Sequence, residues 1–227
     1  MKYQVLLSLI LISLFSQPLL AQNPIPPATV KNIEKVFSFA KRGYDERNAW
    51  NLVKAANILI NHPEIQDLSK NKVEKDSLGE NELYKDFFNP QLMLIDADKI
   101  APIDAKTLHF AIKQSQKRIP DWVMMKAKLK EEGGIIQVKN YMIASKNSKT
   151  IKTDFDYNKK VTLSVRVGND LRLSVFDTAK RKKVGNSKFI GDARMLSFIT
   201  ESDGEHQIKI ENVSNQSNDC LLMIETR

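Results

Sequence analysis

Two aspartates, Asp170 and Asp177, frame the segment DLRLSVFD, whose apolar residues alternate as in a strand. Carboxylates at strand ends can hold calcium, which takes about six to eight oxygen ligands. The two residues lie seven positions apart, so their Cα atoms are about 23 Å apart in an extended chain at roughly 3.3 Å per residue. A calcium site would therefore need Asp170 to be joined by Asn169 or by Asp192. We expect an architectural role instead, with Asp177 starting the next turn by accepting bonds from backbone N–H groups; calcium is the alternative.

The other residue types that carry out catalysis are isolated in this sequence. His62, His109 and His206 fall in different expected elements and form no H-x-x-x-H pair, so no histidine-rich zinc site is predicted. Cys220 is the only cysteine. We expect it half-buried in the final strand, because a nucleophilic thiol needs a histidine partner. The sequence therefore predicts no catalytic residue and no cofactor, and a pair of carboxylates assembled by folding stays an open alternative.

Basic residues exceed acidic ones, with a net charge of +8 and a pI near 9.4. Such a charge favours anionic partners, but the lysines are spread along the chain and only 7% of residues are aromatic. Nucleic acid is therefore not a predicted partner, because single-strand binders combine basic and stacking residues. The densest basic cluster is Lys180, Arg181, Lys182 and Lys183. We expect an exposed, solvated turn there, and contact with an anionic glycan or another polyanion is the alternative.

The two tryptophans lie in different settings. Trp50 is next to Ala49 and near Val53 on an expected helical stripe, so we expect it in the core. Trp122 follows Pro120, where the spacing of apolar residues changes. We expect Trp122 to pack the helices against the strands, and an exposed ring that stacks on a sugar is the alternative.

The first residues have the pattern of a secretory signal. Lys2 precedes an apolar run from Val5 to Phe15, and the small Ala21 offers a cleavage point. The run is about 11 residues long, whereas a membrane-spanning helix needs about 20. We therefore expect a cleaved signal peptide at 1–22, a protein that is periplasmic or secreted, and no later membrane span.

Helical spacing extends from Pro27 to about Arg118. Apolar residues recur three and four positions apart in four segments, whose expected caps or first residues are Thr29, Asp45, Asn89 and Asp104. Short connections indicate that the segments pack as helical hairpins. The polar stretch 68–86 between the hairpins is expected to be a flexible loop.

After Pro120 the spacing changes from three and four to two. Residues 121–134 are ambiguous and end at Gly133 and Gly134, and short alternating segments separated by turn residues follow. The predicted fold class is α+β, with an N-terminal helical bundle followed by a C-terminal antiparallel β-sandwich of jelly-roll type. The predicted division is a signal peptide at 1–22, a bundle at 23–120, a junction at 121–134 and a sandwich at 135–227.

Two stretches of the sandwich, NDLRLSVFDTAKRKKVGNS and DGEHQIKIENVSNQSNDCLLMIE, resemble the bacterial pre-peptidase C-terminal domain, a β-sandwich at the tail of many exported proteins. The residues that fit its usual DLDLYVYD and GxYxIxVxN patterns are Asp170, Leu171, Leu173, Val175, Asp177, Gly204, Ile208, Ile210 and Asn212. Arg172 stands where a second acidic residue is usual, and His206 replaces the usual aromatic residue.

The helical stretches YDERNAWNLVKAANILINHPE and FNPQLMLIDADKIAPIDAKTLHFAI resemble the region that precedes this domain in a group of exported bacterial proteins without an assigned activity. The resemblance implies a fold and an export route, but no reaction. We therefore expect an exported, non-catalytic accessory protein that contacts another envelope or secreted protein. A glycan- or polyanion-binding protein is one alternative, and a carboxylate-dependent hydrolase with its site between the two regions is another.

Overall fold

The computed structural model describes residues 25–68, 83, 85–166, 170–185, 187–190 and 193–227. The expected signal peptide and most of the expected loop 68–86 lie outside these ranges. The helices are α2 (Pro27–Asp45), α3 (Ala49–Asn61), α4 (Pro90–Ile100), α5 (Lys106–Gln116) and α6 (Ile119–Glu132). The strands are β1 (Ile65–Asp67), β2 (Ile136–Ile143), β3 (Ser148–Phe155), β4 (Lys160–Arg166), β5 (Leu171–Asp177), β6 (Lys182–Val184), β7 (Lys188–Ile190), β8 (Ala193–Ile199), β9 (Gly204–Asn212) and β10 (Asn218–Thr226).

The helices form where the spacing predicts them, but most of their expected first residues are wrong. Asn89 caps α4 as predicted, because its side chain accepts hydrogen bonds from the N–H groups of Gln91 and Leu92. Helix α2 already begins at Pro27, a residue whose fixed φ suits the first turn, so Thr29 is not its cap.

Two other expected helix starts also differ. Asn48 caps α3 through a bond from the N–H group of Asn51, whereas Asp45 is the last residue of α2. Helix α5 begins at Lys106 without a side-chain cap, two residues after Asp104. The expected starts at Thr29, Asp45 and Asp104 thus differ from the observed ones by two to four residues. The sequence has several residues of capping type near each boundary, so their type alone does not identify the cap.

Trp50 is not in the core, and the prediction for it is wrong. Its side chain is 43% exposed, whereas Ala49 and Val53 are buried. Successive residues of a helix are about 100° apart around its axis. Trp50 therefore lies to one side of the stripe that Ala49 and Val53 define.

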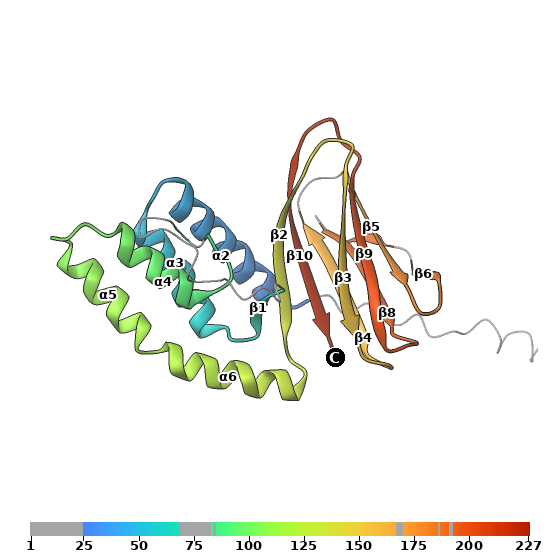
Figure 1. Ribbon diagram of the computed structural model, residues 1–227, viewed down its shortest axis with the longest axis horizontal. Coiled ribbons are helices and arrows are strands. Elements are labelled where there is room, and N and C mark those ends of the chain that lie inside the picture. Colours follow the sequence, from blue (N-terminus) through green and yellow to red (C-terminus); the bar gives the residue numbers. More distant parts are fainter. Residues whose placement is uncertain (1–24, 69–82, 84, 167–169, 186, 191–192) are drawn as a thin grey trace, which may run out of the picture.

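The strands form two sheets that face each other (Figure 1). One has six strands in the order β1-β2-β10-β4-β8-β7, and the other has four in the order β3-β9-β5-β6. All pairs are antiparallel except β1 with β2, where Ile65 pairs with Ile136 in parallel. The mixed α+β architecture is as predicted, and the jelly-roll type of the sandwich stays a prediction.

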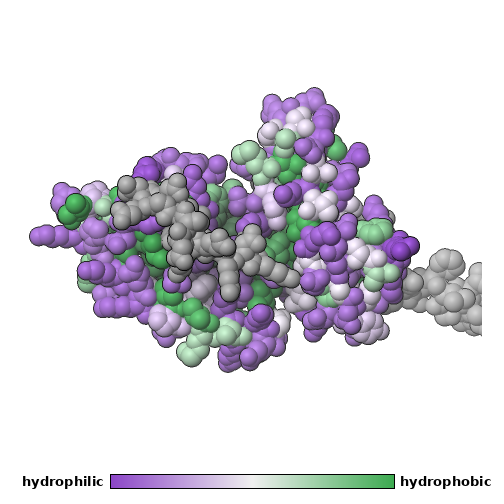
Figure 2. Space-filling view, viewed as in Figure 1, coloured by the Kyte–Doolittle hydropathy of each residue, from purple (hydrophilic) through white to green (hydrophobic). Residues whose placement is uncertain are grey.

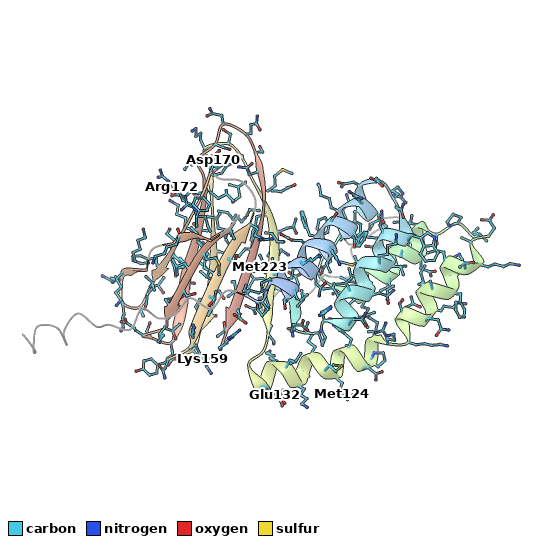
Figure 3. All side chains as sticks on the ribbon, turned by 180° about the vertical axis from the view of Figure 1, so that it is seen from behind. Met124, Glu132, Lys159, Asp170, Arg172 and Met223 are labelled. Carbon is cyan, nitrogen blue, oxygen red and sulfur yellow. The ribbon has the colours of Figure 1, made fainter. Side chains whose placement is uncertain are left out.

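Strand β10 contributes to two different apolar cores. Cys220, Leu222 and Ile224 point into the sandwich between the two sheets. Leu221 and Met223 point the other way and pack with the helices, together with Val138 of β2 and Ile65 of β1. Figure 3 shows Met223 where the sandwich meets the helices. The helices and the six-stranded sheet therefore share one core.

The ambiguous segment after Pro120 is a helix. Helix α6 runs beneath the bundle toward the start of β2 (Figure 1), and it ends at Gly133, whose φ of 77° suits glycine. Trp122 is its one buried residue. Among the described helices of the chain, none is long and apolar enough to cross a bilayer.

Candidate functional site

The two aspartates of the DLRLSVFD segment lie in different environments. Asp177 is buried, and its carboxylate accepts hydrogen bonds from the Lys180 N–H at 3.0 Å and the Ser202 hydroxyl at 2.8 Å. Burial opposes ionisation of Asp177, but these bonds and the nearby His206 ring outweigh it, so that the pKa of the carboxyl lies below its ordinary value. The predicted role of Asp177 in starting a turn is confirmed.

Asp170 lies at the far end of the sandwich from Lys159 (Figure 3) and is exposed. Asn169 and Asp192, its proposed partners for calcium, lie outside the described residues. Within the described ranges, no group of three or more His, Cys, Asp or Glu side chains is placed to hold a metal ion. The calcium site stays a prediction.

The Asp177 environment makes stability depend on pH. The pKa of an aspartate in an unfolded chain is about 3.9, and that of Asp177 is lower in the folded protein. Its stabilising effect is therefore complete above about pH 5 and is lost as the pH falls through the folded pKa. We expect Asp177→Asn to melt about 5 °C lower than the wild type at pH 7.

The difference in melting temperature between Asp177→Asn and the wild type should become smaller below about pH 4, where the wild-type carboxylate takes up a proton. Thermal unfolding followed by circular dichroism at both pH values measures it. The matched control is Asp170→Asn, at the exposed residue just before β5, which should have the melting temperature of the wild type at both pH values. A difference for Asp177→Asn that stays constant with pH would contradict the account.

The contact between His206 and Asp177 is one that the sequence analysis did not predict. Its ring is buried, Nδ1 donates to the Gly204 carbonyl at 3.0 Å, and Nε2 lies 3.7 Å from the Asp177 carboxylate. Ser202 bonds to Asp177 and not to the ring, whereas nucleophilic catalysis requires a hydroxyl bonded to the imidazole. The three residues therefore fix the β5–β6 turn against β9. The sequence did contain a signal for the burial of His206, because this residue replaces the usual aromatic residue of the GxYxIxVxN pattern.

The basic cluster is exposed, as expected, but only Lys180 and Arg181 are in the turn, whereas Lys182 and Lys183 begin β6. The ammonium groups of Lys180 and Lys182 lie 2.8 and 2.7 Å from one oxygen of Glu201. Their hydrogen bonds lower the pKa of Glu201 to about 2. Glu201 therefore offsets part of the positive charge on which the predicted polyanion contact depends.

Helix α6 exposes an apolar surface. Val123, Met124 and Met125 are 50%, 67% and 50% exposed. Space filling shows apolar side chains among hydrophilic ones along the lower edge of the molecule, where α6 lies (Figure 2), and Met124 projects away from the bundle (Figure 3). No sequence signal distinguished this surface from a core stripe.

Trp122 lies on the inner side of α6 with its ring 6% exposed. This burial does not fit an exposed sugar-stacking ring. The ammonium group of Lys126 lies 5.1 Å from the ring centroid, and the indole N–H has no hydrogen-bond partner among the residues that the structure describes. Packing of Trp122 between helices and strands stays a prediction, because its described neighbour is on its own helix.

Two carboxylates near the junction of the two regions influence each other electrostatically. Asp67 ends β1 and lies 3.5 Å from the ammonium group of Lys139 on β2. Burial raises the pKa of Asp86 above its ordinary value, and the charge of Asp67 adds to the rise. Such a pair contains the residue types of acid–base chemistry, but neither residue lines the cavities described for this chain.

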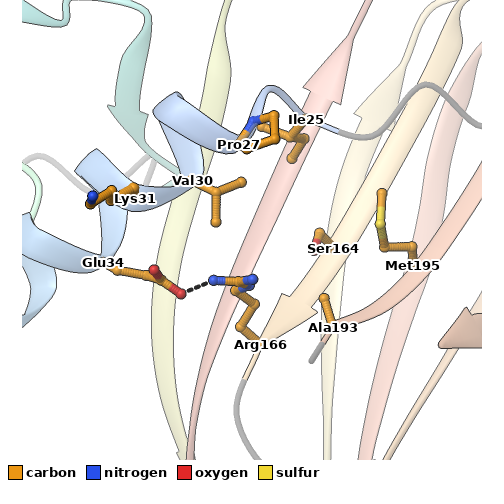
Figure 4. Close-up of a pocket in the computed structure, with 9 residues that line it drawn as sticks. All are labelled: Ile25, Pro27, Val30, Lys31, Glu34, Ser164, Arg166, Ala193 and Met195. Carbon is orange, nitrogen blue, oxygen red and sulfur yellow. Dashed lines mark hydrogen bonds and ion pairs between the residues drawn. The ribbon is translucent and has the colours of Figure 1, made fainter. Parts of the chain in front are cut away.

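A cavity of about 460 Å³ opens between the first turns of α2 and the outer face of β4 and β8. Its lining is drawn in Figure 4 and consists of Ile25, Pro27, Val30, Lys31, Glu34, Ser164, Arg166, Ala193 and Met195. An ion pair between Glu34 and Arg166 joins the helix to the sheet at one end. The junction is thus filled over β2 and β10 and hollow over β4 and β8.

No protein-family model and no curated protein matches this chain. Solved structures that are similar include a periplasmic inhibitor of g-type lysozyme from Aeromonas hydrophila, with 10% identity over 40% of this chain and 84% of the other and a TM-score of 0.33. The corresponding inhibitor from Salmonella Typhimurium has 13% identity over 40% and 87%, also with a TM-score of 0.33.

A pre-peptidase C-terminal domain, of a collagenase from Bacillus anthracis, is also among the similar structures. It has 9% identity over 39% of this chain and 88% of its own, with a TM-score of 0.33. The kind of domain that the strand motifs resemble is thus among the matches. At this identity and TM-score, the functions of these proteins are not carried over to this chain.

Proposed function

We propose that this chain is an exported, non-catalytic accessory protein that binds another protein through the outer face of α6. The observation that carries the proposal is the exposure of Val123, Met124 and Met125 on a helix that buries only Trp122. Contiguous exposed apolar side chains with a polar rim are typical of protein interaction sites. Methionine is common at such sites because its side chain adapts to the partner.

Helical phase places part of this apolar set on one side of α6. At about 100° per residue, Pro120, Met124 and Ala127 lie roughly opposite Trp122, Val123 lies about 100° from it and Met125 only about 60° from it. Lys128 and Lys130 flank this side, and Glu131 ends it one turn after Ala127. The segment Ile119–Glu132 contains three lysines and three acidic residues, and therefore no net charge. An apolar centre with charges of both signs at its rim fits an apolar groove on a protein. A helix without net charge is not drawn to an anionic bilayer.

The test is retention of a partner by the purified protein from a periplasmic extract, compared between two methionine variants. We expect Met124→Glu to reduce the retained partner at least about tenfold, because a charge in the centre of an apolar interface costs much of the binding energy. Met142→Glu is the matched control. Met142 is 73% exposed on β2, six residues or about 20 Å along the strand from the end next to α6.

Capture that is equal for the two variants would contradict the proposal, as would capture by neither the wild type nor the control. Binding to phosphatidylglycerol vesicles that Met124→Glu abolishes would instead assign the face to lipid. Circular dichroism of each variant checks that the fold is retained.

Two alternatives have less support. Contact of Lys180–Lys183 with an anionic glycan is weakened by the pairing of Lys180 and Lys182 with Glu201. A hydrolase would use Asp67 and Asp86, but Asp67 is already paired with Lys139. Both alternatives predict that Met124→Glu leaves glycan binding or hydrolysis unchanged, because neither activity involves Met124.

A further inference from the structure

We infer that the cavity between α2 and the outer face of β4 and β8 binds a small amphiphile with one carboxylate and a short apolar chain. This site is separate from the α6 face and goes beyond the proposed protein binding. A cavity of about 460 Å³ falls in the usual range for small-molecule sites, roughly 300 to 1,000 Å³, which are mostly apolar with a few polar groups.

The walls of the cavity suit an apolar chain. Ile25 and Val30 approach from the N-terminal end of α2, and Ala193 and Met195 come from β8. Both β8 residues belong to the outer face of the six-stranded sheet, because they pair with Arg166 and Ser164 of β4. The helices that cover β2 and β10 leave this part of the sheet to the cavity.

Ser164 places one polar atom on the floor of the cavity. The residue is 3% exposed and lines the cavity in Figure 4. Its hydroxyl makes no hydrogen bond to any described residue, whereas the neighbouring hydroxyls of Thr162 and Ser197 bond to each other at 3.1 Å. The hydroxyl is not one of the fully buried side-chain atoms that lack a partner, so it is accessible from the cavity. It can donate a hydrogen bond to, or accept one from, a polar atom of a ligand in the cavity.

The charged side chains at the rim of the cavity favour a ligand with a negative charge. Lys31 and Arg166 are cationic, and Glu34, which pairs with Arg166, is the one anion of the lining. Lys31 forms no ion pair within the described part of the chain. The lining thus has a net charge of +1, which favours a single carboxylate over a neutral or cationic head group.

The experiment is a calorimetric titration of the purified protein with decanoate, decanol and decylamine. We expect decanoate to bind most tightly. Lys31→Gln should weaken decanoate about fivefold, and Glu34→Gln should tighten it, because the two changes move the rim charge in opposite directions. Ala193→Leu should weaken every ligand at least about tenfold by filling the floor.

Two controls keep the outcome specific. Lys35→Gln, on an exposed lysine next to Glu34 that does not line the cavity, should leave decanoate binding unchanged. Met124→Glu should do the same, so that failure of the α6 proposal and failure of this one are distinguishable. No binding of decanoate, equal binding of the three probes, or insensitivity to Ala193→Leu would overturn the inference.

Discussion

Met223→Ala is expected to lower the free energy of unfolding by about 3 kcal/mol, because it removes a buried side chain from the core that helices and sheet share. Met223 is fully buried and lies between Val138 of β2 and Ser164 of β4 in the six-stranded sheet. Its side chain packs on the helix side of that sheet. The loss therefore affects the contact between the two regions and not the interior of the sandwich.

Urea unfolding followed by circular dichroism measures this loss. Met142→Ala is the matched control, because Met142 is 73% exposed on β2 and its truncation should change the stability by less than about 0.5 kcal/mol. Equal stability of the two alanine variants would mean that the helices contribute little to the fold of the sheet.

Asn212→Ala is also expected to lower the free energy of unfolding by about 3 kcal/mol. Asn212 is 2% exposed. Its amide group donates to the carbonyls of Ile143, Ala144 and Gln216, and its carbonyl oxygen accepts from Ser214 and Asn218. One side chain thus joins the ends of β2 and β9 to the turn before β10. Removing it deletes all of these hydrogen bonds at once, including the buried one to the Ile143 carbonyl.

The same urea measurement tests this prediction, with Asn147→Ala as control. Asn147 is exposed, and its side chain bonds only to the neighbouring Ser148 N–H among described residues, so its removal should cost less than about 0.5 kcal/mol. A loss below 1 kcal/mol for Asn212→Ala would show that the network contributes little. Asn212 is a position of the family resemblance, and its role here is structural.

The sequence predicted the sandwich better than its surroundings. Alternation identified the long strands, since Leu171, Leu173 and Val175 all face the interior. It could not identify β1, which has three residues and forms only because β2 lies beside it. The short β6 and β7 were missed for the same reason.

Burial was predicted correctly for apolar residues that recur with helical or strand spacing, but not for some single residues. Trp50 follows a stripe residue but faces solvent, and Cys220, expected to be half-buried, is fully buried. Burial raises the pKa of its thiol to about 12. Both faces of β10 are covered, one by the second sheet and one by the helices. No local pattern indicates a helix layer on the outer face of a sheet.

The candidate sites were largely beyond prediction. The cavity combines α2 with β4 and β8, which are separated by more than 100 residues, and its polar group is an ordinary serine. The α6 face depends on which side of a helix packs inward, and the segment 121–134 had no clear periodicity. Only Asp177 could be assigned beforehand, because turn chemistry is local.

The helices and the sandwich are expected to fold as one unit around the core that they share. Two natural probes report on the two parts. Both tryptophans, Trp50 and Trp122, are in helices, whereas the only cysteine, Cys220, faces the interior of the sandwich. Tryptophan fluorescence therefore follows the helices, and pulsed labelling of the Cys220 thiol follows opening of the sandwich.

Both signals should be measured across one urea series on the purified wild-type protein. We expect one urea midpoint for both fluorescence and thiol labelling, as in two-state unfolding. A fluorescence transition that is complete while Cys220 is still protected would contradict it, because the helices would then unfold from an intact sandwich.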